Sequence, residues 1–551
     1  MQVKLAPQPM SVLALLVENA GELVTREQIQ KRIWGEQTFV DFDRNLNVCM
    51  AQIRAALHDD ADSPRFIRTV PKRGYVFLAP LERPPVLQSS PAAESNGGVE
   101  AKTPDRARVW LAALAGAVAA IAIAGVWVYW LKPPATAPPP RAMIAVLPFE
   151  ASAGDQPIAD GLADEIISSI GTIPNDRLGV IARTSVVHYK SSPPDLRQIA
   201  ADLAARYLVE GSVRRDGDRV HVTARLIGSA DQRVLWTDSY EESGEDLFTL
   251  EQVTGARISA AVIRNLFPQT SIPRKGLHTP PREAFEAYRL GRALQEQGTI
   301  DALKRSLAAF EDAVRLDRRY ADAYSALAES CVSLARSGGP AEPMFTRAAD
   351  AAGKALQFDE ASAEAHDALA NVQFWRDWNW PGAEQHFKRA LTINASYAAA
   401  HHDYAWFLVA TGRTEQALIS LRRSIALDPL SPRINIDAGW LLQYAHRYEE
   451  AINQAKRARD LDPALEEARF CIERAEFYLG RGAQPPPERG DAYSLAIHFA
   501  AVGDKQKALD SLDKTFADRS IELPLLNVDP AFQSLQPEPR FQKLIARLAY
   551  P

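Results

Sequence analysis

The sequence predicts a multidomain chain: a small α+β head, a single transmembrane helix, an α/β unit and an all-α repeat superhelix, in that order. Three observations predict this arrangement. An uncharged apolar run covers 109–131, alternating strand-like and helix-like segments follow it, and beyond residue 283 the sequence repeats in blocks of 34 residues. A chain of 551 residues is also expected to hold roughly three or four structural units.

Composition limits the kinds of function. The formal net charge is −6, so any contact with nucleic acid must come from a local basic patch and not from bulk charge. The three cysteines, Cys49, Cys331 and Cys471, are widely spaced and form no CxxC pair. We therefore expect them to be unpaired, and we expect no metal site and no cofactor.

The head, residues 1–82, shows three helical patterns and then a short hairpin. The first covers Pro9 to Asn19, and the second begins at the N-cap residue Thr25 and ends at Gly35. The third helix, 44–57, carries an apolar stripe made by Leu46, Met50, Ile53 and Leu57. Its opposite face is small and polar, as a helix in a major groove requires.

The hairpin FIRTVPKRGYVFLAP is basic. Between Ser63 and Leu81 it has four basic residues and no acidic one, and the turn presents Lys72 and Arg73 at its tip. Such a tip suits contact with phosphates or the minor groove. The alternative is a solvated basic hairpin with no ligand.

The string VTREQIQKRIWGEQTFVDFDRNLNVCMAQIRAALHDDADSPRFIRTVPKRGYVFLAP resembles the winged-helix effector domain of OmpR/PhoB-type regulators, most closely the membrane-bound CadC/ToxR kind. The resemblance implies that the third helix reads the major groove and that the hairpin is a wing. Two departures predict a weaker head: Ala51 and Gln52 stand where many relatives carry a basic pair, and only MQVKLA precedes Pro7, where relatives have a small sheet. Either the translation start is placed too late or the head is truncated. Carried over by position, the DNA-contacting residues are Arg44, Asn47, Val48, Gln52, Arg54, Thr69, Lys72 and Arg73.

The run 109–131 is long enough to cross a bilayer as one helix, with interfacial aromatic residues at both ends. A buried core helix is the alternative. Basic residues before the run outnumber those after it, which predicts a single pass through the inner membrane with the N-terminus cytoplasmic and the C-terminal part periplasmic or extracytoplasmic. Linkers are expected at 83–108 and 132–142. A stripe of small residues predicts a homodimer, unless it reflects only an alanine-rich composition; it consists of Ala112, Gly116, Ala120 and Ala124.

Residues 143–268 alternate strands and helices and include a hairpin with Asp216 and Gly217 at its turn. The strings IADGLADEI, VIARTS and YLVEGSVRRDGDRVHVTARLI resemble the TolB amino-terminal-like domain, which names a fold and no ligand. We interpret Asp160, Asp164 and Glu165 as carboxylates of a first helical turn that complement the helix dipole. No catalytic motif is present, so we expect no enzyme.

Residues 283–551 form the repeat region. Three blocks in phase, Glu364–Tyr397, Ala398–Ser431 and Pro432–Leu465, resemble tetratricopeptide repeats, and weaker copies cover 287–320, 321–362 and 489–522. Stacked helix pairs imply a superhelix with a concave surface. Four tryptophans either pack between helices or line that surface for a ligand; these are Trp375, Trp378, Trp380 and Trp406.

Together these patterns predict a membrane-integral, one-component transcription regulator that binds double-stranded DNA through its head and a protein or peptide partner through its repeats. The alternative is an extracytoplasmic scaffold or assembly protein with a degenerate head.

Overall fold

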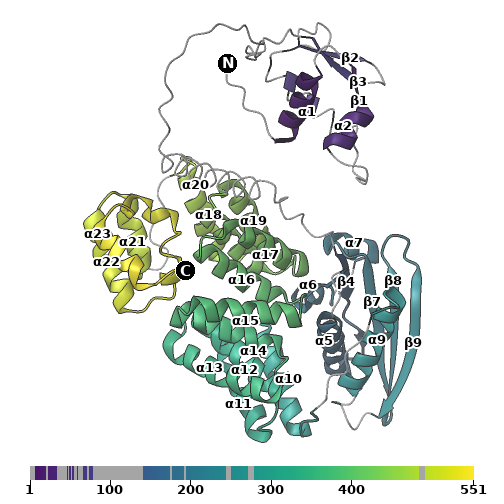
Figure 1. Cartoon of the computed structure of the whole chain (residues 1–551). Helices are drawn as coiled ribbons and strands as arrows, with labels where there is room; N and C mark the ends of the chain where they lie inside the picture. Colours follow the sequence, from purple (N-terminus) through teal and green to yellow (C-terminus); the bar gives the residue numbers. More distant parts are fainter. Residues whose placement is uncertain are drawn as a thin grey trace, which may run out of the picture. The chain divides into compact units, whose positions relative to one another are not determined.

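A computed structural model describes two compact units, 1–131 and 132–551 (Figure 1). In the first, the described residues are 7–19, 23–33, 46, 49–50, 53–54, 57, 59, 66–70 and 74–78. In the second they are 141–551 without 174–176, 191–193, 244–247, 249, 271–277 and 483–489.

The head unit combines helices with a small antiparallel sheet of order β1-β3-β2. Thr25 and Gln28 form a reciprocal capping box: the Thr25 hydroxyl accepts from the Gln28 amide at 3.2 Å, and the Gln28 side chain accepts from the Thr25 amide at 2.8 Å. The predicted N-cap at Thr25 is therefore confirmed. The elements are α1 (Pro7–Glu18), β1 (Leu23–Thr25), α2 (Arg26–Ile33), β2 (Ile67–Val70) and β3 (Gly74–Phe77).

The apolar stripe of the third helical pattern is also confirmed, because Leu46, Met50 and Ile53 are buried in the core of the head. β2 and β3 pair antiparallel, as the hairpin predicted. Strand β1 was not predicted; it pairs with β3 where a Cβ on Gly74 would lie only 2.0 Å from the Val24 carbonyl oxygen. A glycine at position 74 thus lets the two strands approach.

The predicted fold class is corrected at one element. Within the part of the chain that the structure describes, no helix is both long enough and apolar enough to span a membrane. The run 109–131, with its stripe of small residues, lies outside the described residues.

The α/β unit is built on a six-stranded sheet with the main order β6-β4-β7-β8-β9. β4 lies parallel to β6 and β7, and β7, β8 and β9 form an antiparallel meander whose predicted turn contains Gly217 at φ +60°. The strands are β4 (Ala142–Val146), β5 (Glu150–Ala151), β6 (Leu178–Val180), β7 (Tyr207–Asp216), β8 (Arg219–Gly228) and β9 (Val234–Ser243).

Helices cover both faces of this sheet. Ile144 and Val146 of β4 face α5 and α9 in one core, whereas Met143 and Ala145 face α7 and the repeats in another. The helices are α5 (Gln156–Thr172), α6 (Arg183–Val186), η1 (Val187–Tyr189), α7 (Leu196–Asp202), the π-helical turn η2 (Leu250–Thr254) and α9 (Gly255–Leu266).

The repeat region consists of antiparallel helix pairs, as predicted, and the first helices of successive pairs contact one another in a row, which we call the A-helix row. The small residues that recur at the same position in all three blocks are buried, including Ala383, Ala417 and Ala451. The pairs are α10 (Arg282–Gln295) with α11 (Ile300–Leu316), α12 (Ala321–Arg336) with α13 (Ala341–Phe358), α14 (Ala363–Val372) with α15 (Trp380–Ile393), α16 (Ala398–Ala410) with α17 (Thr414–Leu427), and α18 (Pro432–Tyr444) with α19 (Tyr448–Leu461). The A-helix row comprises α10, α12, α14, α16, α18 and then α20 (Glu466–Tyr478).

The pair formed by α14 and α15 contains an irregular turn. A π-helical turn, η3 (Gln373–Asp377), follows α14, and Trp378 ends it in the left-handed conformation at φ +54°. This insertion shifts the spacing between α14 and α16 away from the 34-residue period.

After α20 the chain forms a C-terminal cap, residues 491–551, with its own apolar core. The cap was expected only as a weak repeat copy over 489–522, and the structure bears out a helix pair there. The elements are α21 (Ala492–Ala501), α22 (Lys505–Ala517), η4 (Leu523–Leu525), η5 (Pro530–Leu535) and α23 (Pro539–Arg547).

The α/β unit and the repeats form one body. The loop between α17 and α18 contacts α6: the Ala182 amide donates to the Leu427 carbonyl at 2.8 Å, and the Ser185 hydroxyl donates to the Asp428 carboxylate at 2.6 Å and accepts from the Leu430 amide at 2.9 Å. The sequence predicted two domains in series and did not predict this contact.

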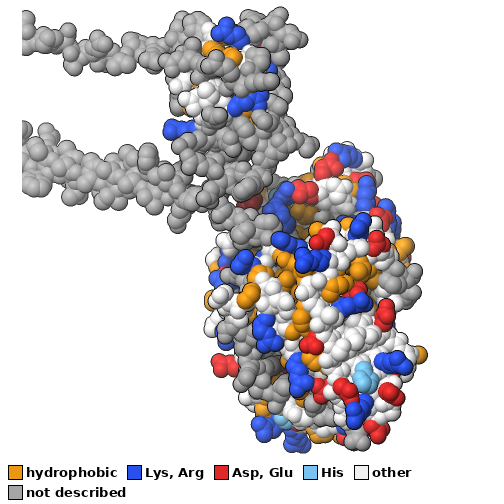
Figure 2. Space-filling model, turned by 90° about the vertical axis from the view of Figure 1, so that its right-hand side faces the viewer, with side chains coloured by type: hydrophobic (Ala, Val, Ile, Leu, Met, Phe, Trp, Pro, Cys, Tyr) orange, Lys and Arg blue, Asp and Glu red, His pale blue; other side chains and the backbone are white. Residues whose placement is uncertain are grey.

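Figure 2 shows one face of the molecule, on which acidic and basic side chains are interspersed. Among the side chains coloured there on the larger unit, no continuous basic field appears of the kind that duplex DNA attracts.

Candidate DNA-binding head and partner-binding repeats

The structure brings two of the eight predicted DNA-contacting residues together. One guanidinium nitrogen of Arg54 donates to the Thr69 hydroxyl at 2.7 Å and lies 3.2 Å from the Ile67 carbonyl oxygen. Arg54 belongs to the third helical pattern and Thr69 to the predicted wing, so this contact ties one to the other. The other six lie outside the described residues and stay predictions: Arg44, Asn47, Val48, Gln52, Lys72 and Arg73.

A second contact joins the same two parts of the head. The Asp59 carboxylate accepts from the backbone amides of Phe66 and Ile67 at 3.0 and 2.9 Å, at the start of β2. Together with Arg54, Asp59 fixes the wing strand relative to the third helix, and such preorganisation suits a two-point contact with a duplex.

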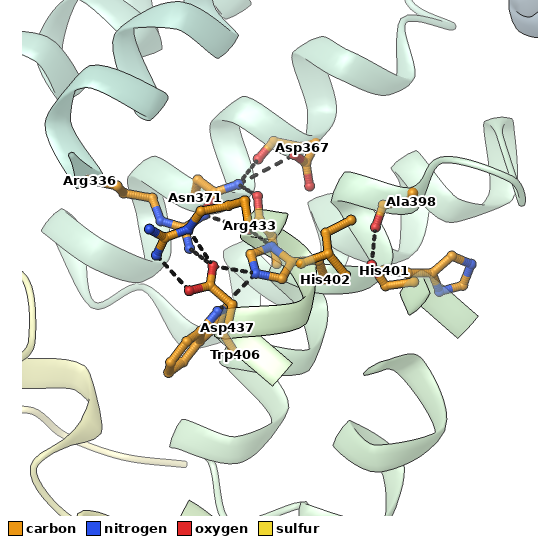
Figure 3. Close-up of polar contacts among 12 residues, drawn as sticks. Arg336, Asp367, Asn371, Ala398, His401, His402, Trp406, Arg433 and Asp437 are labelled. Carbon is orange, nitrogen blue, oxygen red and sulfur yellow. Dashed lines mark hydrogen bonds and ion pairs between the residues drawn. The ribbon is translucent and has the colours of Figure 1, made fainter. Parts of the chain in front are cut away.

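In the repeats, charged side chains meet in the A-helix row (Figure 3). Asp367, Asp403 and Asp437 come from α14, α16 and α18, and all three are buried, Asp437 being only 1% exposed. His402 lies between two of them, with Nδ1 2.8 Å from Asp403 and Nε2 2.8 Å from Asp437.

Further polar groups extend this buried cluster to four helices. Arg336 of α12 pairs with Asp403 at 2.6 Å, and Arg433 pairs with Asp437 at 2.5 Å. The Asn371 amide donates to the second carboxylate oxygen of Asp403 at 2.8 Å. The cluster therefore links consecutive repeats through charge-assisted hydrogen bonds.

The pKa values in the cluster are set by burial and by neighbouring charges. Burial opposes the charged forms of His402, Asp403 and Asp437, but their mutual contacts and the nearby arginines outweigh it. The pKa of His402 is therefore raised, and those of Asp403 and Asp437 are lowered. Burial and the neighbouring Asp403 charge raise the pKa of Asp367 well above its usual range, which favours its protonated form.

The carboxylates of this cluster are buried. We interpret the cluster as a device that fixes the register of the A-helices, which is one use of buried ion pairs. Sequence reasoning missed it, although Asp403 and Asp437 recur at the repeat period. The described residues contain no group of three or more histidine, cysteine or acidic side chains placed to hold a metal ion.

The four tryptophans singled out in the sequence are packing residues in the structure. Trp375, Trp380 and Trp406 are buried, and Trp378 packs partly buried against the same core. The Trp375 indole donates to Asn371 at 3.1 Å. All three cysteines are buried and carry free thiols.

The carboxylates near residue 160 have a different role from the predicted one. Helix α5 begins at Gln156, so Asp160 and Asp164 do not lie in its first turn. Asp160 pairs with Lys190 at 2.7 Å and Asp164 with Arg183 at 2.5 Å. Burial is the largest cause that raises the pKa of Asp164, to about 6.

These carboxylates face a buried glutamate where the α/β unit meets α10. Glu251 is 3% exposed, and Arg289 of α10 lies 3.2 Å from its carboxylate. Burial raises the pKa of Glu251 to about 8 despite Arg289, because nearby acidic residues including Asp164 and Glu165 oppose its ionisation. The carboxyl group also fills the space where a Cβ on Gly161 would lie.

Three family models match parts of the chain. Residues 1–77 match the model of the transcriptional regulatory protein C-terminal domain, residues 140–254 that of the second domain of HilA/YgeH-like transcriptional regulators, and residues 379–436 a tetratricopeptide repeat. The chain thus contains an OmpR/PhoB-type DNA-binding domain and tetratricopeptide repeats, and its first two matched domains are those of transcription regulators. The likeness of the α/β unit to TolB stays a prediction.

Two of three relatives are named as transcription regulators, and the third has a different name. The transcriptional regulator HilA of Salmonella typhimurium is 22% identical over 78% of this chain and 67% of its own length. The cholera toxin homolog transcriptional activator of Vibrio parahaemolyticus is 32% identical over 18% of this chain and 33% of its length. A Rhizobium meliloti protein named putative adenylate cyclase 3 is 27% identical over 44% of this chain and 43% of its own length. The chain thus spans less than half of the length of the last two relatives.

Proposed function

We propose that the chain is a one-component transcription regulator that binds duplex DNA through its head and receives a signal as a protein or peptide partner at its repeats. The observation that carries the proposal is the match of residues 1–77 to a regulator's DNA-binding domain, followed by a regulator's second domain at 140–254. The HilA relative, named a transcriptional regulator, aligns with 78% of this chain.

The geometry of the head supports the DNA-binding part. The buried stripe of Leu46, Met50 and Ile53 fixes which side of the third helix packs on the core. Arg54 and Asp59 tie that helix to the wing strand. The predicted base-reading residues Asn47 and Gln52 fall off the stripe by helical periodicity.

Binding of the purified full chain to labelled duplex DNA tests this part of the proposal. Affinity should fall steeply as salt is raised, because phosphate contacts release counterions. Replacing Lys72 and Arg73 with alanine should weaken binding to every sequence and reduce the salt dependence. The matched control replaces Arg318 and Arg319, an exposed basic pair in the repeats, and should bind as the parent does. Equal binding by both double variants would contradict the role of the wing.

A cytoplasmic N-terminal part and an extracytoplasmic C-terminal part stay predictions from the charges around 109–131. Reporter fusions after residues 105 and 280 would test them, and a periplasm-active reporter that is inactive at 280 would contradict them.

A further inference from the structure

The C-terminal cap places one of its segments on the A-helix row. Residues 519–529, RSIELPLLNVD, include η4, which contacts both α16 and η3. Leu525 is 4% exposed and belongs to the principal apolar core of the repeats, and Ile521 and Val528 pack against that core. The following residue, Leu526, belongs instead to the cap's own core. The segment therefore lies between two separate apolar cores.

A buried ion pair holds the C-terminal end of this segment. The Asp529 carboxylate is buried and accepts from the Arg474 guanidinium at 2.5 Å and from the Tyr493 hydroxyl at 3.0 Å. Arg474 belongs to α20, and its guanidinium lies 5.6–5.9 Å from the centres of three aromatic rings, those of Trp440, Tyr444 and Tyr478. The repeats thus provide a cation in an aromatic surround, and the cap provides the carboxylate.

Other contacts hold the N-terminal end of the segment. The Arg519 guanidinium lies 5.4 Å from the centre of the Trp378 ring and donates to the Arg376 carbonyl at 3.1 Å. The end of the chain returns to the same place, because the Tyr550 ring stacks on Trp380 at 4.9 Å and its hydroxyl donates to the Pro524 carbonyl at 2.9 Å. The segment is thus held at both ends, with an aliphatic side chain inserted between them.

We propose that the surface between Trp378 and Arg474 is a binding site for a partner's segment of aliphatic residues followed by a carboxylate, and that residues 519–529 occupy it as an internal ligand. The proposal rests on the partner-binding role of the repeats given above, and it adds the chemistry of the partner and the means of regulation. A competing segment needs an aliphatic group in place of Leu525 and an Asp or Glu in place of Asp529.

The internal ligand determines how tightly such a partner must bind in order to displace it. A segment tethered in the same chain is present at an effective concentration of roughly millimolar, so a weak partner cannot displace it. The cap has its own core, which includes Phe532 and Phe541 together with Leu523 and Leu526 of the segment. Exchange therefore moves the segment off the repeats together with the cap.

The test measures binding of a fluorescent peptide of sequence RSIELPLLNVD to the full chain. The parent should bind it weakly, because its own segment occupies the site. A chain carrying Leu525→Ala and Asp529→Asn should bind it about tenfold more tightly or better, since both changes weaken the hold of the repeats on the internal ligand. Asp510→Asn, at an exposed cap residue paired with Arg540, should bind as the parent does.

A third variant adds Arg474→Gln to the weakened cap and should lose the gain. Circular dichroism of each variant shows whether it is folded; if the double cap variant unfolds, Asp529→Asn alone is compared with the parent and with Asp510→Asn. Equal peptide binding by the parent and the folded cap variant overturns the proposal, and so does a gain that survives Arg474→Gln. DNA binding is measured separately: its loss with peptide binding intact contradicts the proposed function and leaves this site standing.

Discussion

At the scale of single residues, the strongest constraints are ionisable groups buried between structural elements. His402 is held between Asp403 and Asp437, and Glu251 lies beneath Arg289 beside other carboxylates. Removing water from a charge costs several kcal/mol unless partners compensate for it. Such groups make the stability of the fold depend on pH, in directions that follow from their shifted pKa values.

For His402 the folded pKa is raised and the unfolded value is near 6.5. Its stabilising contribution is therefore fully present below pH 6.5 and is lost as the pH rises through the folded value. We expect His402→Gln to lower the free energy of unfolding by about 3 kcal/mol at pH 6 and by less at pH 9. Urea unfolding followed by tryptophan fluorescence measures both differences. Equal losses at the two pH values would contradict a charged His402.

For Glu251 burial raises the folded pKa from 4.5 to about 8. The folded chain then holds a proton that the unfolded chain releases, so stability falls as the pH rises from 4.5 to 8. Glu251→Gln removes this loss and should stabilise the chain by about 3 kcal/mol at pH 7, with little change at pH 4.5. Glu283→Gln, at an exposed position of α10, is the control and should match the parent throughout. If the free energy of unfolding of the variant changed with pH as that of the parent does, the raised pKa would be refuted.

At the scale of elements, helices with a periodic sequence could be predicted. Helix boundaries that no apolar periodicity marks could not. The three repeat blocks were predictable because the same offset must hold a small residue wherever two helices cross, as at Ala417. The start of α5 was missed because the residues around it, DQPIAD, show little apolar periodicity. The placement of η4 was missed because it depends on a contact with α16, far away in sequence.

The crossing position itself can be tested. Ala417 is 1% exposed, so Ala417→Leu must displace neighbouring side chains and should cost about 2 kcal/mol of unfolding free energy. The neighbouring Gln416 is exposed, and Gln416→Leu introduces the same side chain at a position of α17 that faces solvent. Thermal unfolding of both variants compares them. A similar loss for both would mean that helix packing is not the cause.

At the scale of the whole molecule, the order of the domains was predictable and their association was not. The α/β unit contacts the repeats through Asp428, which accepts hydrogen bonds from Thr184 and Ser185. The residues of these hydrogen bonds lie some 240 positions apart in the sequence. Nothing in the sequence around a hydroxyl or a carboxylate indicates so distant a partner. Of the predicted DNA contacts, only Arg54 and Thr69 could be placed, and they contact each other.

The central claim is that this chain reads a DNA sequence through its head. Selection of duplexes from a random library by the purified full chain tests it most directly. The account predicts enrichment of a short motif, a shift in the preferred base for Asn47→Ala, and loss of enrichment when Lys72 and Arg73 are replaced with alanine. A folded chain that enriches no motif would contradict the claim and would favour a scaffold with a degenerate head.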